Sequence, residues 1–185
     1  MDAIDKSLAD IEAEWEQVAA NAIAESIASN PSEDLYAAGF WLFYCDYTVI
    51  HPPCFALNTK SHLAKAQDKK YHRWSPPNWK FDVVDGTTDA MMPSYVPLHG
   101  DHSDETWPLI IERHKLMISN VCRSLTWNAK EGAGRFQGIS LNPKFVVGIF
   151  EGQNGPEEYE ELVELSVDYE LVEELRILKL SLIDI

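Results

Sequence analysis

The residues best suited to chemistry lie in one short polar stretch, residues 99–105. His99, Asp101 and His102 offer two imidazoles and a carboxylate, groups that bind divalent metals when a loop brings them together. Their spacing matches no established metal motif, because two histidines three residues apart in a loop fix no geometry. The other interpretation is a polar loop that enters a helix capped by Ser103. We expect that loop and no cofactor, with metal binding as the alternative.

Other patterns that accompany catalysis are weak in this chain. Gly132 and Gly134 lack the lysine of a phosphate-binding loop and follow an expected helix, so they suit its termination. His114 lies near an apolar helical face and is expected to be a packed or edge residue, since a general base would need a placed partner that the sequence does not show. Neighbouring acids such as Glu157 and Glu158 point about 100° apart on a helix, which is poor geometry for a catalytic dyad. We therefore expect a protein that is not an enzyme.

Two tryptophans stand in a proline-broken segment, residues 71–79 (YHRWSPPNW), within the one locally basic stretch of the chain. Trp74 and Trp79 could stack on a base or a sugar, as aromatic platforms of nucleic-acid-binding proteins do. Tryptophans flanked by prolines are also common where side chains close the edge of a core. We expect structural packing, with protein contact as the alternative.

The formal net charge is −15, and it is concentrated at the two ends. Residues 1–34 carry nine acids and one base, residues 151–185 carry eleven acids and two bases, and residues 35–150 are nearly neutral. Phosphate binding requires clustered lysine and arginine, so we expect no nucleic-acid partner. Acidic fields speed encounter with basic protein surfaces, which makes a basic protein the expected partner. The alternative is that the acidic helices only keep the protein soluble.

Apolar periodicity predicts two long helices. Apolar residues recur every three or four positions over residues 4–29, and Asn30-Pro31 ends that helix. A second long helix is expected over residues 103–130, and its apolar positions include Leu116 and Trp127. The other expected elements are a strand hairpin over 35–50 with its turn at Cys45-Asp46, a helix from Asn58 or Thr59 to Lys70, strands at 79–84 and 145–150, a turn at Asp85-Gly86, acidic helices over 157–176, and a strand or helical extension over 177–185.

These elements lack regular βαβ spacing, so they predict the α+β class. We expect one domain, residues 1–185, with a mainly antiparallel sheet packed against a long N-terminal helix, a long central helix and acidic C-terminal helices. No 18-residue apolar run exists, which excludes a membrane span, and the acidic N-terminus lacks a secretory signal. Cys45, Cys54 and Cys122 show no C-x-x-C spacing and are expected to be reduced in a cytoplasmic protein. The oligomeric state stays open.

Several elements occur in an order that is shared with a known family. An amphipathic N-terminal helix leads into residues 35–40 (LYAAGF), then 56–59 (ALNT), 71–79 and 140–143 (SLNP). This order resembles a bacterial family known as domain of unknown function 4303. Residues 71–79 look like its Y-x-W-S-P-x-x-W pattern with an extra residue before the first tryptophan, and Leu57 is inserted in an Ala-Asn-Thr-like element. The resemblance covers residues 4–145 and implies an α+β domain with no catalytic residues to carry over.

Small acidic bacterial proteins of this kind resemble immunity proteins, which bind and neutralise a toxin. Our hypothesis is therefore a non-enzymatic, immunity-type inhibitor of a basic toxin such as a nuclease, in which acidic segments imitate a polyanion. The alternatives are a metal-binding or small-ligand enzyme that uses the loop at residues 99–105, and a structural or regulatory subunit. The expected contact residues lie in the C-terminal acidic segment: Glu157, Glu158, Tyr159, Glu160, Glu161 and Glu164.

Overall fold

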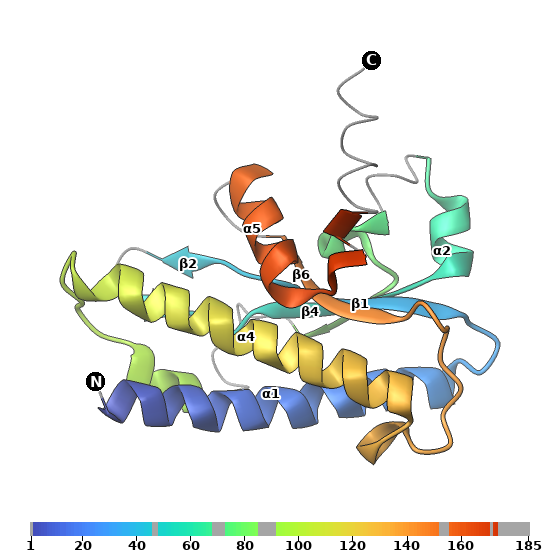
Figure 1. Ribbon diagram of the computed structural model, residues 1–185, viewed down its shortest axis with the longest axis horizontal. Helices are drawn as coiled ribbons and strands as arrows, with labels where there is room; N and C mark the ends of the chain where they lie inside the picture. Colours follow the sequence, from blue (N-terminus) through green and yellow to red (C-terminus); the bar gives the residue numbers. More distant parts are fainter. Residues whose placement is uncertain are drawn as a thin grey trace.

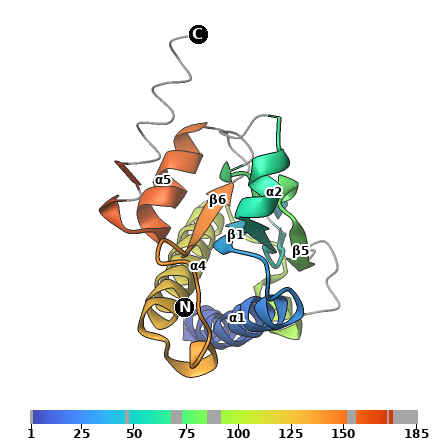
Figure 2. The same cartoon turned by 90° about the vertical axis from the view of Figure 1, so that its right-hand side faces the viewer.

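The computed structural model describes residues 2–45, 48–67, 73–84, 92–151, 156–170 and 172–173. Two long helices cover one face of a four-stranded sheet. A short helix lies on the other face, together with the segment of Trp74 and Trp79 (residues 73–79), called the tryptophan segment below (Figure 1, Figure 2). Within the described residues, no helix has both the length and the apolar character to cross a membrane. The main elements are α1 (Asp2–Ser29), β1 (Leu35–Trp41), β4 (Cys54–Thr59), β5 (Phe81–Val84), α4 (Thr106–Glu131), β6 (Val146–Glu151) and α5 (Pro156–Ser166).

The sheet has the strand order β5-β4-β1-β6. β1 pairs antiparallel with β4 and parallel with β6, and β4 pairs antiparallel with β5. The sheet is therefore mixed, with antiparallel pairs in the majority, and the α+β class predicted from the sequence is confirmed. Alternate residues of each strand face the two layers, since Phe55 and Leu57 join the core under the long helices while Ala56 faces the tryptophan segment.

The hairpin predicted over residues 35–50 is wrong in its pairing. β1 pairs with β4, and β2 (Tyr44–Cys45) pairs with β3 (Val49–Ile50) in a separate two-stranded sheet. Cys45 belongs to β2, and Asp46 lies outside the described residues. β4 pairs with β1 because the apolar side chains of β4, which follows Pro52-Pro53, complete the core beside β1.

The helix after β4 begins where the sequence predicts it. Asn58 and Thr59 end β4, and the helix α2 occupies Lys60–Lys65. The Thr59 hydroxyl accepts a hydrogen bond from the His62 backbone N–H at 3.2 Å, so the predicted cap at this position is confirmed. The helix was expected to reach Lys70 and is shorter, because Ala66 leaves the helical conformation with a ψ of 140° and ends α2 at Lys65.

The boundaries of the central helix follow the local signals in the sequence. The Ser103 side-chain oxygen accepts a hydrogen bond from the Thr106 backbone N–H at 3.2 Å, one turn before α4 proper. α4 ends at Gly132, which has a φ of +61°, a left-handed conformation that glycine adopts without strain. The turn expected at Asp85-Gly86 and the segment 177–185 lie outside the described residues.

The acidic C-terminal region is helical where it is described. α5 begins at Pro156, and residues 169–170 and 172–173 are also helical. α5 packs on β6 and on α4, so it lies along the β6 edge of the sheet (Figure 2). Leu162 joins the core beneath the long helices, and Val163 joins the core beneath the tryptophan segment. The helix therefore contributes to both layers.

The free edge of β6 is occupied by hydroxyl groups from the two helices beside it. The Thr126 hydroxyl of α4 accepts a hydrogen bond from the Val147 N–H at 2.9 Å and donates one to the Val147 carbonyl at 3.3 Å. The Ser166 hydroxyl of α5 accepts from the Ile149 N–H at 2.9 Å. These bonds satisfy buried strand donors that would otherwise offer an edge for another chain.

Replacing Ser166 by alanine should destabilise the fold, because the buried Ile149 N–H would lose its acceptor. We expect the free energy of unfolding of Ser166→Ala to fall by about 1–3 kcal/mol. Chemical denaturation monitored by circular dichroism measures it. The exposed Ser140 is the matched control, and Ser140→Ala should stay within about 0.5 kcal/mol of the parent. Equal stability of the two variants would contradict the role of Ser166.

Candidate functional site

The loop at residues 99–105 does not assemble a metal site. His99 Nε2 lies 3.3 Å from the carbonyl oxygen of Ile50, and His102 Nε2 lies 2.9 Å from that of Leu98. Asp101 is exposed. Among the described residues, no group of three or more histidine, cysteine, aspartate or glutamate side chains could hold a metal. The imidazoles tie the loop to the fold, which agrees with the polar-loop interpretation.

His114 belongs to a buried chain of hydrogen bonds in the main core. The Trp15 indole N–H donates to the Tyr95 hydroxyl at 2.9 Å, and that hydroxyl lies 2.9 Å from His114 Nε2. On the other side of the ring, Nδ1 lies 3.2 Å from the Tyr44 hydroxyl. A neutral imidazole completes this chain, with Tyr95 donating to Nε2 and Nδ1–H donating to Tyr44.

The surroundings of His114 make it a packing residue. Its side chain is fully buried, and burial lowers its pKa from 6.5 to about 3 because the charged form loses its hydration. A general base must reach a proton of its substrate, and a fully buried imidazole cannot do so. The expectation that His114 packs against the core is confirmed.

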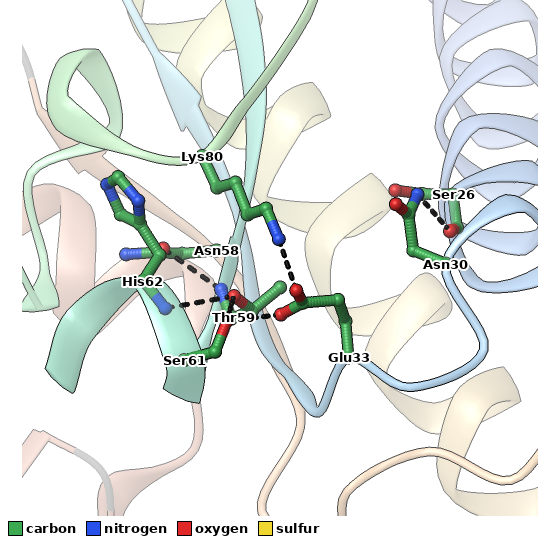
Figure 3. A network of polar contacts seen from close by, with 8 residues as sticks. All are labelled: Ser26, Asn30, Glu33, Asn58, Thr59, Ser61, His62 and Lys80. Carbon is green, nitrogen blue, oxygen red and sulfur yellow. Dashed lines mark hydrogen bonds and ion pairs between the residues drawn. The ribbon is translucent and has the colours of Figure 1, made fainter. Parts of the chain in front are cut away.

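A network of polar side chains lies where the α1–β1 loop meets α2 and the start of β5 (Figure 3). Glu33 accepts hydrogen bonds from the Lys80 ammonium and the Ser61 hydroxyl. Ser61 is also 3.1 Å from the Thr59 hydroxyl, which caps α2. The cluster therefore joins three segments at one end of the sheet.

This cluster is built for holding segments together and is poorly suited to proton transfer. The hydrogen bonds from Lys80 and Ser61 lower the pKa of Glu33 to about 2. A carboxylate with so low a pKa is a weak base, so it cannot activate the Ser61 hydroxyl as a nucleophile. The arrangement can fix the α2 start against the sheet, and we assign it that structural role.

Trp74 and Trp79 are both buried, as the packing interpretation expects. Their rings lie 5.1 and 5.7 Å from the ring of Phe150 on β6. A Cβ on Gly39 of β1 would come within 2.8 Å of Trp79, so the missing side chain makes room for the indole. The Tyr36 hydroxyl donates to the Arg73 carbonyl at 2.8 Å and fixes the segment on the sheet. Neither indole offers a face for stacking on a base.

The contact surface predicted on α5 includes one residue, Glu158, that the fold buries. Glu158 is buried, and its carboxylate lies 3.1 Å from the Lys115 ammonium of α4, with exposed side-chain fractions of 6% and 8%. Tyr159 is half-buried against the core beneath the tryptophan segment. Both face inward because α5 must bury one side against α4 and β6. Glu158 is therefore not available as a partner contact, whereas Tyr159 keeps part of its surface exposed.

Three of the other four glutamates predicted as contacts on α5 are exposed: Glu160, Glu161 and Glu164. The side chain of Glu157 lies outside the described part of the structure. Glu161 also acts on Lys115, whose pKa is raised. Burial alone would lower the pKa of Lys115. The hydrogen bond and charge of Glu158, with the charges of Glu112 and Glu161, outweigh that effect.

The structure brings out an apolar stripe on the outer surface of α4, which the sequence interpretation missed. Leu109, Leu116 and Trp127 are exposed by 59%, 50% and 62%. Leu116 and Trp127 had been counted with the buried positions and are instead exposed. The three residues are spaced by seven and eleven positions, close to two and three helical turns, so they lie on one face. This spacing was the signal in the sequence that could have separated them from the core positions.

Both acidic segments flank this α4 stripe. In Figure 1, α4 lies between α1 and α5, and it packs against both. On the α1 side, Glu12 accepts a side-chain hydrogen bond from Asn120, and the pKa of Glu12 is raised by burial and by the neighbouring charge of Glu16. On the α5 side, Glu161 lies near Lys115. Tertiary packing thus places carboxylates of α1 and α5 on the two sides of α4, which carries these exposed apolar residues.

A small hollow lies at the Trp127 end of the α4 stripe. Its volume is about 70 Å³, and it is lined by residues of α4 and by the end of α5. The Lys130 ammonium and the Asp168 carboxylate form an ion pair of 2.7 Å at its rim. The exposed Trp127 indole could insert into a pocket of a partner, and the hollow could receive a side chain of that partner, as in closely packed protein interfaces.

Comparison of the chain with protein-family models, with curated proteins and with solved structures gives no match. The resemblance to domain of unknown function 4303 therefore stays a prediction.

The buried His114 should make stability depend on pH. Below about pH 6.5 the unfolded chain binds a proton at His114 that the folded chain, with its pKa of about 3, does not bind. The free energy of unfolding should therefore fall as the pH falls. Between about pH 7 and pH 5 the wild type should lose on the order of 2 kcal/mol more than His114→Gln. Urea denaturation at both pH values measures this; the same loss in both proteins would contradict it.

Proposed function

We propose that this chain is a non-enzymatic binding protein for a basic protein partner. The observation that carries the proposal is the exposed stripe of Leu109, Leu116 and Trp127 on α4, flanked by carboxylates of α1 and α5. Protein interfaces combine an apolar centre that excludes water with a polar rim. Here carboxylates of α1 and α5 lie on the flanks while Arg123 and Lys130 lie beside Trp127, so the complementary partner surface has an apolar patch with lysine and arginine opposite the acidic flanks.

The partner class that fits this charge is a toxin with a cationic cleft, such as a nuclease, and the protein would then act as an immunity-type inhibitor. A nuclease must hold phosphates, so its cleft concentrates positive charge. A chain of net charge −15 with two acidic flanks can occupy such a cleft in place of the polyanion. The acidic flanks would raise the rate of encounter, and the α4 stripe would slow dissociation.

Self-association through the same stripe is the competing explanation for its exposure. In a symmetric dimer each copy offers the same patch to its partner, so the flanks of two copies would come close together. Glu12, Glu16 and Glu161 would then face like charges, which destabilises a contact. The acidic rim favours a partner of opposite charge over a second copy.

Reversing charges on the flanks should weaken binding of a partner captured from source-cell lysate. We expect the double variant Glu16→Lys and Glu161→Lys to bind at least about tenfold more weakly, mainly through slower association, and to lose much of the salt dependence. Surface plasmon resonance at two salt concentrations measures both. Glu25→Lys is the control, because Glu25 is exposed on α1 nine residues from Glu16, about 180° around the helix. Equal effects of the two changes would place the interface elsewhere.

Truncating the indole of the α4 stripe should remove an anchor of the contact. Trp127→Ala is expected to weaken binding of the same partner by at least about thirtyfold while leaving thermal stability near the parent value, since the ring is exposed. Val96→Ala is the control, because Val96 is a comparably exposed apolar residue on a different element, η3 (Pro93–Leu98). Unchanged affinity in Trp127→Ala would exclude the stripe as the interface.

A further inference from the structure

A groove lies on the opposite face of the sheet from α1 and α4, beyond the tryptophan segment. Its volume is about 420 Å³, within the range of small-molecule sites. Its lining combines aromatic rings, small side chains and one carboxylate: Trp41, Phe43, Cys54, Ala56, Asp82 and the two prolines of η1 (Pro76–Asn78).

Strand pairing explains why the sheet is hollowed here. Cys54 and Ala56 point to the same face of β4, and their small side chains form the floor. Trp41 of β1 is paired with Cys54, and Asp82 of β5 is paired with Ala56, so these two side chains stand on opposite sides of the floor. Trp79 covers the same face of the sheet over Gly39, two residues before Trp41 on β1.

The walls of the groove have complementary chemistry. Trp41 and Phe43 are half-buried, with ring centroids 6.1 Å apart at an interplanar angle of 67°, so the two rings form a corner. The His51 ring packs against Phe43, with the two ring centroids 5.6 Å apart. The carboxylate side chain of Asp82 is exposed on the facing strand. Aromatic faces and a carboxylate together attract one kind of ligand, a cation with apolar substituents.

We propose that this groove binds an organic cation of the alkylammonium class, with the positive charge held between the Trp41 and Phe43 rings and the Asp82 carboxylate. An anion would be repelled by Asp82. A neutral apolar ligand would gain from the rings but would leave the carboxylate without a charged partner. The cation has two possible sources, a free quaternary ammonium molecule or a methylated lysine side chain of a polypeptide, and both present the same chemistry. The proposal is independent of the partner surface on α4.

Calorimetric titration of the full chain tests the proposal with defined probes. Choline is the free cation, 3,3-dimethylbutan-1-ol is its neutral isostere, and a short peptide with one trimethyl-lysine is the polypeptide form. We expect saturable binding of choline, of the peptide or of both, and binding of the neutral isostere at least about tenfold weaker. Choline alone would identify a free small molecule, and the peptide alone would identify a polypeptide.

Matched variants separate the groove from general attraction to an acidic protein. Asp82→Asn and Trp41→Leu should each weaken binding about tenfold. Asp101→Asn and Trp127→Leu make the same chemical changes at exposed positions outside the groove and should leave the affinity unchanged. In a second measurement, bound cation should slow alkylation of Cys54 by iodoacetamide, read on the Cys54 peptide by mass spectrometry, because that thiol lies on the floor and is not in a disulfide.

Three results would overturn the proposal. The first is equal binding of choline and its neutral isostere, which would make the groove an apolar site with no selectivity for charge. The second is equal weakening in Asp82→Asn and Asp101→Asn, which would make the attraction non-local. The third is no saturable binding of either cation to the folded wild type together with unchanged Cys54 alkylation.

Discussion

The packing of α4 is the constraint on which the rest of the structure depends. One side of this helix buries Met117, Ile118, Val121 and Leu125 in the main core. Its flanks contact α1 and α5, and its Thr126 hydroxyl satisfies the edge of β6. Successive residues of a helix are rotated by about 100°, so three neighbours leave only a narrow strip uncovered. That strip carries the exposed apolar stripe, and its position between two acidic helices follows from the same packing.

The buried ion pair between Lys115 and Glu158 fixes how α5 meets α4. Taking both charges out of water is costly, and the hydrogen bond between them offsets that cost only in one geometry. Because neither charge can be left alone in the interior, the pair disfavours other rotations of α5 about its axis. In the rotation observed, Leu162 and Val163 face the two cores and Glu160, Glu161 and Glu164 stay exposed. A glutamate that resembles a surface residue thus determines which of its neighbours form the acidic flank.

The tryptophan segment shows how a motif can be informative without being a site. Trp74 and Trp79 fill the face of the sheet opposite the long helices, where Gly39 leaves space for an indole. The groove begins where that cover ends, on the small side chains of Cys54 and Ala56. The two surfaces with functional character therefore lie on different faces of the sheet and share no residue.

The sequence by itself determined the α+β class, the two long helices, the caps at Thr59 and Gly132, and the packing of His114 and both tryptophans, because these depend on local periodicity, turn chemistry and burial of apolar groups. It did not determine that β1 pairs with β4, since antiparallel alternation looks the same for a near and a more distant partner. Only the tertiary structure decided that Glu158 is buried, that Leu116 and Trp127 are exposed, and that both acidic ends lie beside α4. The physical reason is that a helix can have more apolar positions than neighbours to cover them, and the neighbours are chosen by the whole fold.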